Sequence, residues 1–305
     1  MSLHITIVPA SSRAGRETIL VLLESKERPF IRGIYRDPSK APAEFTKQPN
    51  FEAVKGDVDT GTGLDFSGSD AVLYVPPPTY DGTDQGQFAT QAATNVEKAL
   101  RAAPNIKKLV LHSALGAQYN HGIGTLKLNH ISDHILKSAA PEVLIVKPGY
   151  YFEDWTSALE TMQEDPPSFR WPIHPADHAI PMVSVKDVGA YCASALISSA
   201  AGTSAPPLPL RYVEIFGPRN YSALDVKKTI EEITGKEGTL ITVEKEGLAD
   251  YFAQGGIPRE YVQDYVEMFV AMRPGGIMAG DFEYKETTVR GGIELDEVFR
   301  ELAGK

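Results

Sequence analysis

A short loop near the amino terminus has the position and the composition of a phosphate-binding turn. Residues 8–15 read V-P-A-S-S-R-A-G and join an apolar segment to a segment with a helical pattern. Dinucleotide-binding loops carry glycines here, so that the backbone can approach a pyrophosphate at a helix amino end. Only the last glycine, Gly15, is present, and Pro9 and Ser12 occupy the positions of the first two. The loop predicts either a nucleotide site in altered form or a simple strand–helix turn.

The side chains of this loop could replace part of what the missing glycines supply. Ser11 and Ser12 offer hydroxyls, and the guanidinium of Arg13 matches the geometry of a phosphate. Pro9 has no N–H and a fixed φ, so the first turn cannot copy the glycine version. We expect Pro9, Ser11, Ser12, Arg13 and Gly15 to contact the cofactor.

The end of the second apolar segment indicates which cofactor this would be. An acidic residue there accepts a hydrogen bond from the ribose 2′-OH of NAD, whereas arginine accommodates the 2′-phosphate of NADP. The chain has Arg36 first after this segment and Lys40 shortly after it. The sequence therefore favours NADP(H) over NAD(H). The alternative is that Arg36 and Asp37 form only a solvated ion pair.

Two further segments end on residues that suit the same site. Gly56-Asp57 follows the third apolar segment, where Asp57 would lie near the adenine. Pro76-Pro77 follows the fourth and would border the nicotinamide ribose. Either pair could instead be only a strand terminator.

Catalytic candidates are fewer, because no tyrosine has a lysine four residues further on. Ser113, after the fifth apolar segment, and Lys127, at the head of the next helix, are the nearest replacements. A lysine there could hold the nicotinamide ribose or act as a general acid. The alternative for Lys127 is an exposed helix-start residue.

Other polar and aromatic groups have weaker patterns. Tyr150 lies in G-Y-Y-F-E-D-W (149–155), whose aromatic residues could wall a substrate pocket or could pack a cap onto the sheet. His130 and His134 have the i, i+4 spacing of metal ligands, but no glutamate stands between them and no third ligand is in view. We expect no metal.

Short apolar runs alternate with amphipathic patterns in the first half of the chain. This alternation predicts an α/β fold: a Rossmann-like, doubly wound parallel sheet whose ligand lies at the carboxyl ends of the strands. The predicted strands are 4–8, 30–35, 51–54, 70–75, 108–112 and 143–146. The predicted helices are 14–25, 84–102 and 126–138.

The regularity weakens after Tyr150 and suggests a smaller, partly helical C-terminal substrate cap. We assign residues 1–150 to the dinucleotide-binding domain, with 180–200 and 211–216 returning to it, and 151–179 and 217–305 to the cap. Within the cap, 154–177 suits a loop–helix insertion, and 222–234 a helix with Ser222 as its N-cap and Gly235 as its stop. Residues 205–209 read as a surface connection.

Composition excludes several classes of protein. The net charge of −10, without a basic cluster, argues against nucleic-acid binding. The single cysteine, Cys192, fits a reducing compartment and reads as a buried thiol. No secretory signal and no long apolar window is visible. We expect a cytoplasmic protein that does not bind membranes.

Taken together, several stretches resemble the NmrA-like family, an atypical branch of the short-chain dehydrogenase/reductases, and especially its fungal members. They are I-V-P-A-S-S-R-A-G-R-E-T-I (7–19), G-I-Y-R-D-P-S-K (33–40), F-E-A-V-K-G-D-V (51–58), S-G-S-D-A-V-L (67–73), G-T-L-K-L-N-H (124–130), P-E-V-L-I-V-K-P-G-Y-Y-F-E-D-W (141–155) and I-P-M-V-S-V-K-D-V-G (180–189).

The resemblance covers roughly the first 235 residues and implies a Rossmann domain that binds NADP(H) or NAD(P). It places the loop, Arg36, Lys40, Ser113 and Lys127 at matching positions. Two departures are His134, where relatives often have an acidic residue that would position Lys127, and Lys147, where they often have arginine.

Three functional hypotheses follow. The first is an NADPH-dependent oxidoreductase that reduces a small, apolar carbonyl, enone or quinone, with Lys127, Tyr150 and Ser113 as catalytic candidates. The second is a non-catalytic dinucleotide sensor that acts through a protein partner or as a homodimer. The third is a redox-silent isomerase or lyase.

Overall fold

The chain forms two compact units that are interleaved in the sequence. The computed structural model describes residues 3–198 and 209–304, so most of the predicted connection 205–209 lies outside the described residues. Unit 1 comprises Met1–Ala114, Leu128–Lys147 and Val188–Val213, and unit 2 comprises Leu115–Lys127, Pro148–Asp187 and Glu214–Lys305.

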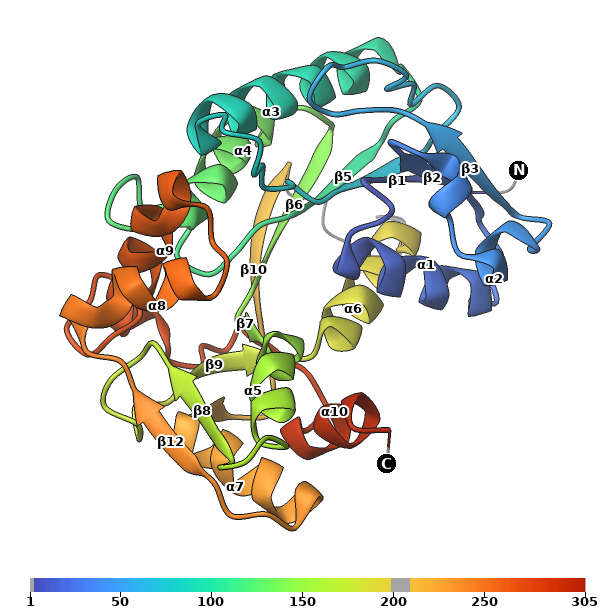
Figure 1. Ribbon diagram of the computed structural model, residues 1–305. Helices are drawn as coiled ribbons and strands as arrows, with labels where there is room; N and C mark the ends of the chain where they lie inside the picture. The colour runs from blue at the N-terminus through green and yellow to red at the C-terminus, as the bar shows by residue number, and fades with distance from the viewer. Residues whose placement is uncertain (1–2, 199–208, 305) are drawn as a thin grey trace. The chain divides into compact units, whose positions relative to one another are not determined.

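A parallel sheet at the centre of unit 1 confirms the predicted doubly wound fold. Its strands run in the order β3-β2-β1-β4-β5-β6-β10, so the order reverses between β1 and β4 (Figure 1). In unit 2, β13 pairs with the end of β10. The strands are β1 (His4–Val8), β2 (Phe30–Tyr35), β3 (Phe51–Lys55), β4 (Ala71–Tyr74), β5 (Lys108–His112), β6 (Glu142–Pro148), β10 (Leu210–Phe216) and β13 (Val289–Arg290).

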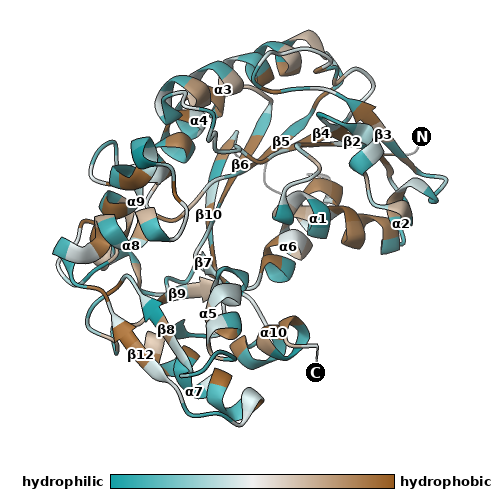
Figure 2. Ribbon diagram, viewed as in Figure 1, coloured by the Kyte–Doolittle hydropathy of each residue, from teal (hydrophilic) through white to brown (hydrophobic). Residues whose placement is uncertain are grey.

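Helices cover both faces of this sheet, with α3 and α4 on one side and α1 and α6 on the other (Figure 1). They are α1 (Arg13–Glu24), α2 (Ala43–Thr46), α3 (Gln85–Ala102), α4 (Lys127–Leu136) and α6 (Val185–Ile197). Hydrophobic and hydrophilic residues mix along these helices (Figure 2), as expected where one side of a helix packs on a sheet. No helix in the described ranges has the length and apolar character that a bilayer crossing would require.

Side-chain alternation along the strands builds the core beneath α3 and α4. Tyr74, Leu111 and Ile145 are register partners on β4, β5 and β6, and all are fully buried. They share a hydrophobic cluster with Ala92 and Val96 of α3. Successive residues of a strand point to opposite faces, so the side chains of intervening residues such as Leu73 and Val110 lie on the other face of the sheet.

Unit 2 combines helices with two small sheets around an aromatic core. Its first sheet has the order β11-β9-β7, and its second pairs β12 with β8 in parallel. The strands are β7 (Tyr150–Tyr151), β8 (Ser168–Trp171), β9 (Ile180–Val183), β11 (Asn220–Tyr221) and β12 (Thr239–Thr242). The helices are α5 (Thr156–Thr161), α7 (Ala223–Thr234), α8 (Leu248–Gln254), α9 (Arg259–Ala271) and α10 (Leu295–Leu302).

The prediction of a loop–helix insertion over 154–177 missed strand β8. Residues 168–171 form a strand only because β12, about seventy positions further along the chain, supplies the partner. The predicted caps of α7 are confirmed. Ser222 accepts a hydrogen bond from the Asp225 N–H at 3.2 Å, the Asp225 carboxylate accepts from the Ser222 N–H at 2.8 Å, and Gly235 has a φ of 71°.

The capping box gives a stability prediction. Ser222→Ala should lower the free energy of unfolding by about 1 kcal/mol, because the Asp225 N–H loses its acceptor. Lys228→Ala, at an exposed position of the same helix, should change it by less than about 0.5 kcal/mol. Thermal and urea unfolding followed by circular dichroism measures both. Equal losses in the two variants would contradict the role given to the cap.

Candidate cofactor and catalytic site

The loop after β1 is a tight serine-capped turn. Ser12 is the N-cap of α1: its hydroxyl accepts a hydrogen bond from the Gly15 N–H at 3.1 Å and donates one to the Pro9 carbonyl at 2.9 Å. One side chain thus joins the end of the strand to the first turn of the helix. The hydroxyl that we predicted to contact a phosphate directly is already engaged in the turn.

Gly15 is required by a close approach inside this turn. A Cβ at this position would lie 2.6 Å from the Ser12 Oγ and 3.0 Å from the Pro9 carbonyl oxygen. A larger residue would therefore displace the cap and the end of β1 together. The resulting turn has small residues beside the amino end of α1, where helix N–H groups lack helical acceptors and favour anions. These properties fit a pyrophosphate group.

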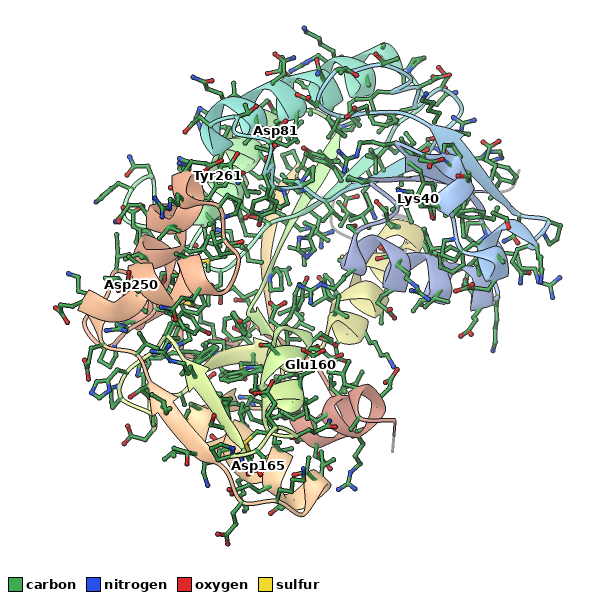
Figure 3. All side chains as sticks on the ribbon, in the orientation of Figure 1. Lys40, Asp81, Glu160, Asp165, Asp250 and Tyr261 are labelled. Carbon is green, nitrogen blue, oxygen red and sulfur yellow. The ribbon has the colours of Figure 1, made fainter. Side chains whose placement is uncertain are left out.

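Arg36, the first residue after β2, forms no ion pair with any residue in 3–198 or 209–304. Asp37 accepts hydrogen bonds from the N–H and the hydroxyl of Ser39, at 3.1 and 2.7 Å, and these bonds lower the pKa of its carboxyl group. Within the described part of the chain, no hydrogen bond or ion pair joins Arg36 to Asp37. Arg36 and Lys40 are both exposed (Figure 3 labels Lys40).

The remaining cofactor candidates lie at the same edge of the sheet. The Val75 N–H donates to the Val8 carbonyl and the Ala10 N–H to the Ile34 carbonyl, so the ends of β1, β2 and β4 are neighbours. Pro76, two residues beyond the end of β4, is buried, and Pro77 is half-buried. Asp57, beyond β3, accepts from the Asp59 N–H at 3.0 Å. Unit 1 thus brings all the predicted cofactor residues other than Lys127 to the carboxyl ends of its strands.

Ser113 belongs to a buried polar cluster. It is 1% exposed, and its hydroxyl donates to the Asp133 carboxylate at 2.8 Å. The other carboxylate oxygen of Asp133 is buried and has no hydrogen-bond partner among the described residues. Burial raises the pKa of this carboxyl group to about 7, against the lowering effects of the Ser113 hydroxyl and the charge of Lys147. Burial also lowers the pKa of the adjacent His112 to about 4.

Sequence reasoning missed Asp133, although one signal was present. The buried residues of α4 include Leu128, Asn129, Ser132, Asp133 and Leu136, which repeat at helical spacing. A carboxylate on such a stripe indicates a buried acid, because the other members of the stripe face the core.

Lys127 and Tyr150 lie in unit 2 and have different surroundings. The Lys127 ammonium pairs with the Asp264 carboxylate of α9 at 3.0 Å, and its side chain is 32% exposed. The Tyr150 ring packs edge-on against Trp171 at a centroid distance of 5.5 Å, beside Trp155 and Phe269. The aromatic residues of this segment therefore pack the core of unit 2.

The histidine pair of α4 forms no metal site with its neighbours. Among residues 3–198 and 209–304, no group of three histidine, cysteine, aspartate or glutamate side chains is arranged to hold a metal ion.

The raised pKa of Asp133 predicts a pH dependence of stability. The folded state keeps the proton up to about pH 7, whereas the unfolded state loses it near pH 4. Stability from this group is therefore present at low pH and falls as pH rises between these values, by roughly 4 kcal/mol at most. Asp133→Asn cannot ionise, so its melting temperature should rise relative to that of the wild type between pH 5 and pH 8. A constant difference across this range would contradict the assignment.

Comparisons with known proteins agree with this fold. Triphenylmethane reductase from Citrobacter sp. superposes with a TM-score of 0.78 at 15% identity, covering all of both chains. The NADPH-dependent quinone oxidoreductase of Escherichia coli, complexed with NADPH, gives 0.75 at 17% identity over 98% of this chain and 99% of that one. NmrA, a negative transcriptional regulator in complex with NAD, gives 0.62 at 15% identity over 79% and 74%.

At these identities the structural likeness shows the fold. A search among curated proteins found no match. Residues 10–198 of the sequence match the model of a family described as NAD(P)H-binding. The matched range begins inside the β1–α1 turn and ends just after α6. The chain belongs to this NAD(P)H-binding family.

Proposed function

We propose that this protein is an NADPH-dependent oxidoreductase of the NmrA-like type that reduces a small, apolar carbonyl, enone or quinone. The observation that carries the proposal is the serine-capped turn at the amino end of α1, in a chain of the NAD(P)H-binding family. The fold shared with a quinone oxidoreductase and a dye reductase supports the reductase activity and the apolar substrate class. We propose a cytoplasmic location for it.

In this proposal the residues of unit 1 bind the cofactor. The turn from Ser11 to Gly15 and the amino end of α1 receive the pyrophosphate, and the exposed cations Arg36 and Lys40 receive the 2′-phosphate. Asp57 borders the adenine, and Pro76 and Pro77 border the nicotinamide ribose. The bound nicotinamide would supply a hydride.

Among the three catalytic candidates, Lys127 has the largest number of protons that it can donate. Its ammonium carries three N–H groups and a positive charge, and it pairs with the Asp264 carboxylate at 3.0 Å. The single hydroxyl hydrogen of Ser113 is directed at Asp133, so Ser113 serves as an acceptor while Asp133 is ionised. Tyr150 contributes its ring to the core of unit 2. Lys127 would thus hydrogen-bond to the substrate oxygen and donate the proton that follows hydride transfer.

A second candidate is a dinucleotide sensor that acts through a protein partner or as a homodimer. It is supported by the fold shared with NmrA, a transcriptional regulator, and by the burial of Ser113. Under this alternative the cofactor binds and is not turned over.

Turnover distinguishes the two candidates. The reductase should oxidise NADPH in the presence of a panel of quinones, enones and aldehydes, followed at 340 nm. Lys127→Met should reduce kcat by about 100-fold or more while the NADPH Kd changes little. NADPH binding without oxidation by any panel member would replace the reductase with the sensor. Unchanged kcat in the variant would remove Lys127 from the mechanism.

The preference for NADP has a separate test. Arg36→Ala should raise the Kd for NADPH about tenfold, roughly 1.4 kcal/mol, and leave the Kd for NADH nearly unchanged, because only NADPH carries the 2′-phosphate. Lys26→Ala removes an exposed cation before the amino end of β2, away from the carboxyl ends of the strands. It should change neither the Kd for NADPH nor the Kd for NADH. Fluorescence quenching measures all the constants, and equal losses for both nucleotides would contradict the assignment of Arg36.

A further inference from the structure

An ion pair joins α1 to α2 beside the segment that follows β2. The Arg16 guanidinium lies 3.1 Å from the Glu44 carboxylate, and the two side chains are 54% and 52% exposed. Arg16 directly follows Gly15 of the tight turn, so the first turn of α1 fixes its backbone. Glu44 is carried by α2, which follows Lys40 after a short connection.

Seven residues separate the end of β2 from the start of α2, so the pair lies near the carboxyl end of β2. Tyr35, the last residue of the strand, is 3% exposed, and its hydroxyl is buried without a hydrogen-bond partner in the described chain. Burial raises the pKa of this phenol to about 12, and the charges that act on it are those of Arg16 and Glu44. In dinucleotide-binding sheets the adenosine ribose lies at this strand end. Arg16 and Glu44 therefore lie beside the strand end at which the ribose 2′ position is read.

In this pair, the cation Arg16 is bound by an anion of the same chain, Glu44. A guanidinium binds carboxylates and phosphates through the same planar fork. An ion pair this exposed contributes little to stability, so a doubly charged phosphate can replace the carboxylate at low cost. Without a phosphate, Glu44 satisfies Arg16, and with one, the Glu44 carboxylate becomes a nearby repelling charge.

We propose that Arg16 is a further ligand of the 2′-phosphate of NADP(H), and that Glu44 is the internal anion which this phosphate displaces. The inference rests on the proposed function, in which Arg36 and Lys40 bind the same phosphate. It assigns to α1 and α2 a role in discriminating NADP from NAD. Arg16 adds a cation that attracts the phosphate. Glu44 competes with the phosphate for this cation and so limits how strongly NADP is preferred over NAD.

Binding constants for NADPH, NADH, 2′-AMP and 5′-AMP test the inference without any activity measurement. Arg16→Met should weaken NADPH and 2′-AMP about fivefold and leave NADH and 5′-AMP unchanged. Glu44→Gln should tighten NADPH and 2′-AMP about threefold, because the competing charge is gone. Arg101→Met and Glu97→Gln, which break a comparable pair on α3, should change none of the four constants. Circular dichroism establishes that each variant is folded.

The outcomes separate this inference from the proposed function. If the wild-type protein binds NADPH and Arg16→Met binds it equally well, the inference fails and the proposed function stands. Equal weakening of NADPH and NADH, or weaker NADPH binding in Glu44→Gln, would also overturn it, since the pair would then be structural. If the wild-type protein binds none of the four nucleotides, the proposed function fails and the inference fails with it.

Discussion

The hydroxyl of Ser12 holds the end of β1 and the start of α1 in one turn, and the arrangement of the candidate site depends on it. By accepting from the Gly15 N–H and donating to the Pro9 carbonyl, it fixes the direction in which α1 leaves the sheet. That direction brings the helix amino end to the reversal between β1 and β4 and sets the position of Arg16 relative to β2. A glycine-rich loop reaches the same result by leaving space, whereas this loop uses a hydrogen-bonded side chain.

In the polar cluster around Asp133, burial lowers the stability of the fold instead of raising it. A carboxyl group inside a packed sheet–helix interface costs stability when it is ionised. Among the residues that the structure describes, only Ser113 hydrogen-bonds to this carboxyl group. Lys147 partly offsets the cost through its charge. An apolar residue on this face of α4 would pack without such a penalty. The presence of an acid at this position is therefore hard to explain by stability alone.

The strands of unit 1 could be predicted because each is a short apolar run bounded by turn residues. The positions of Arg36, Asp57 and Pro76 at strand ends follow from that periodicity alone. The pairing of β8 with β12 could not be predicted, since a short strand depends on a partner distant in sequence. The same limit applies to Lys127 and Asp264, and to Arg16 and Glu44. Their contacts arise between elements whose packing the local sequence does not encode.

The interleaving of the two units has a consequence for how this protein is made. The sheet of unit 1 lacks its outer strand β10 until residues near 213 have been synthesised, while residues 115–127 and 148–187 of unit 2 are already present. Neither unit is a continuous piece of chain, so neither corresponds to a fragment that a single cut would release. A nascent chain must hold both units incomplete at once, with the backbone N–H and C=O groups along one edge of β6 unpaired until β10 arrives.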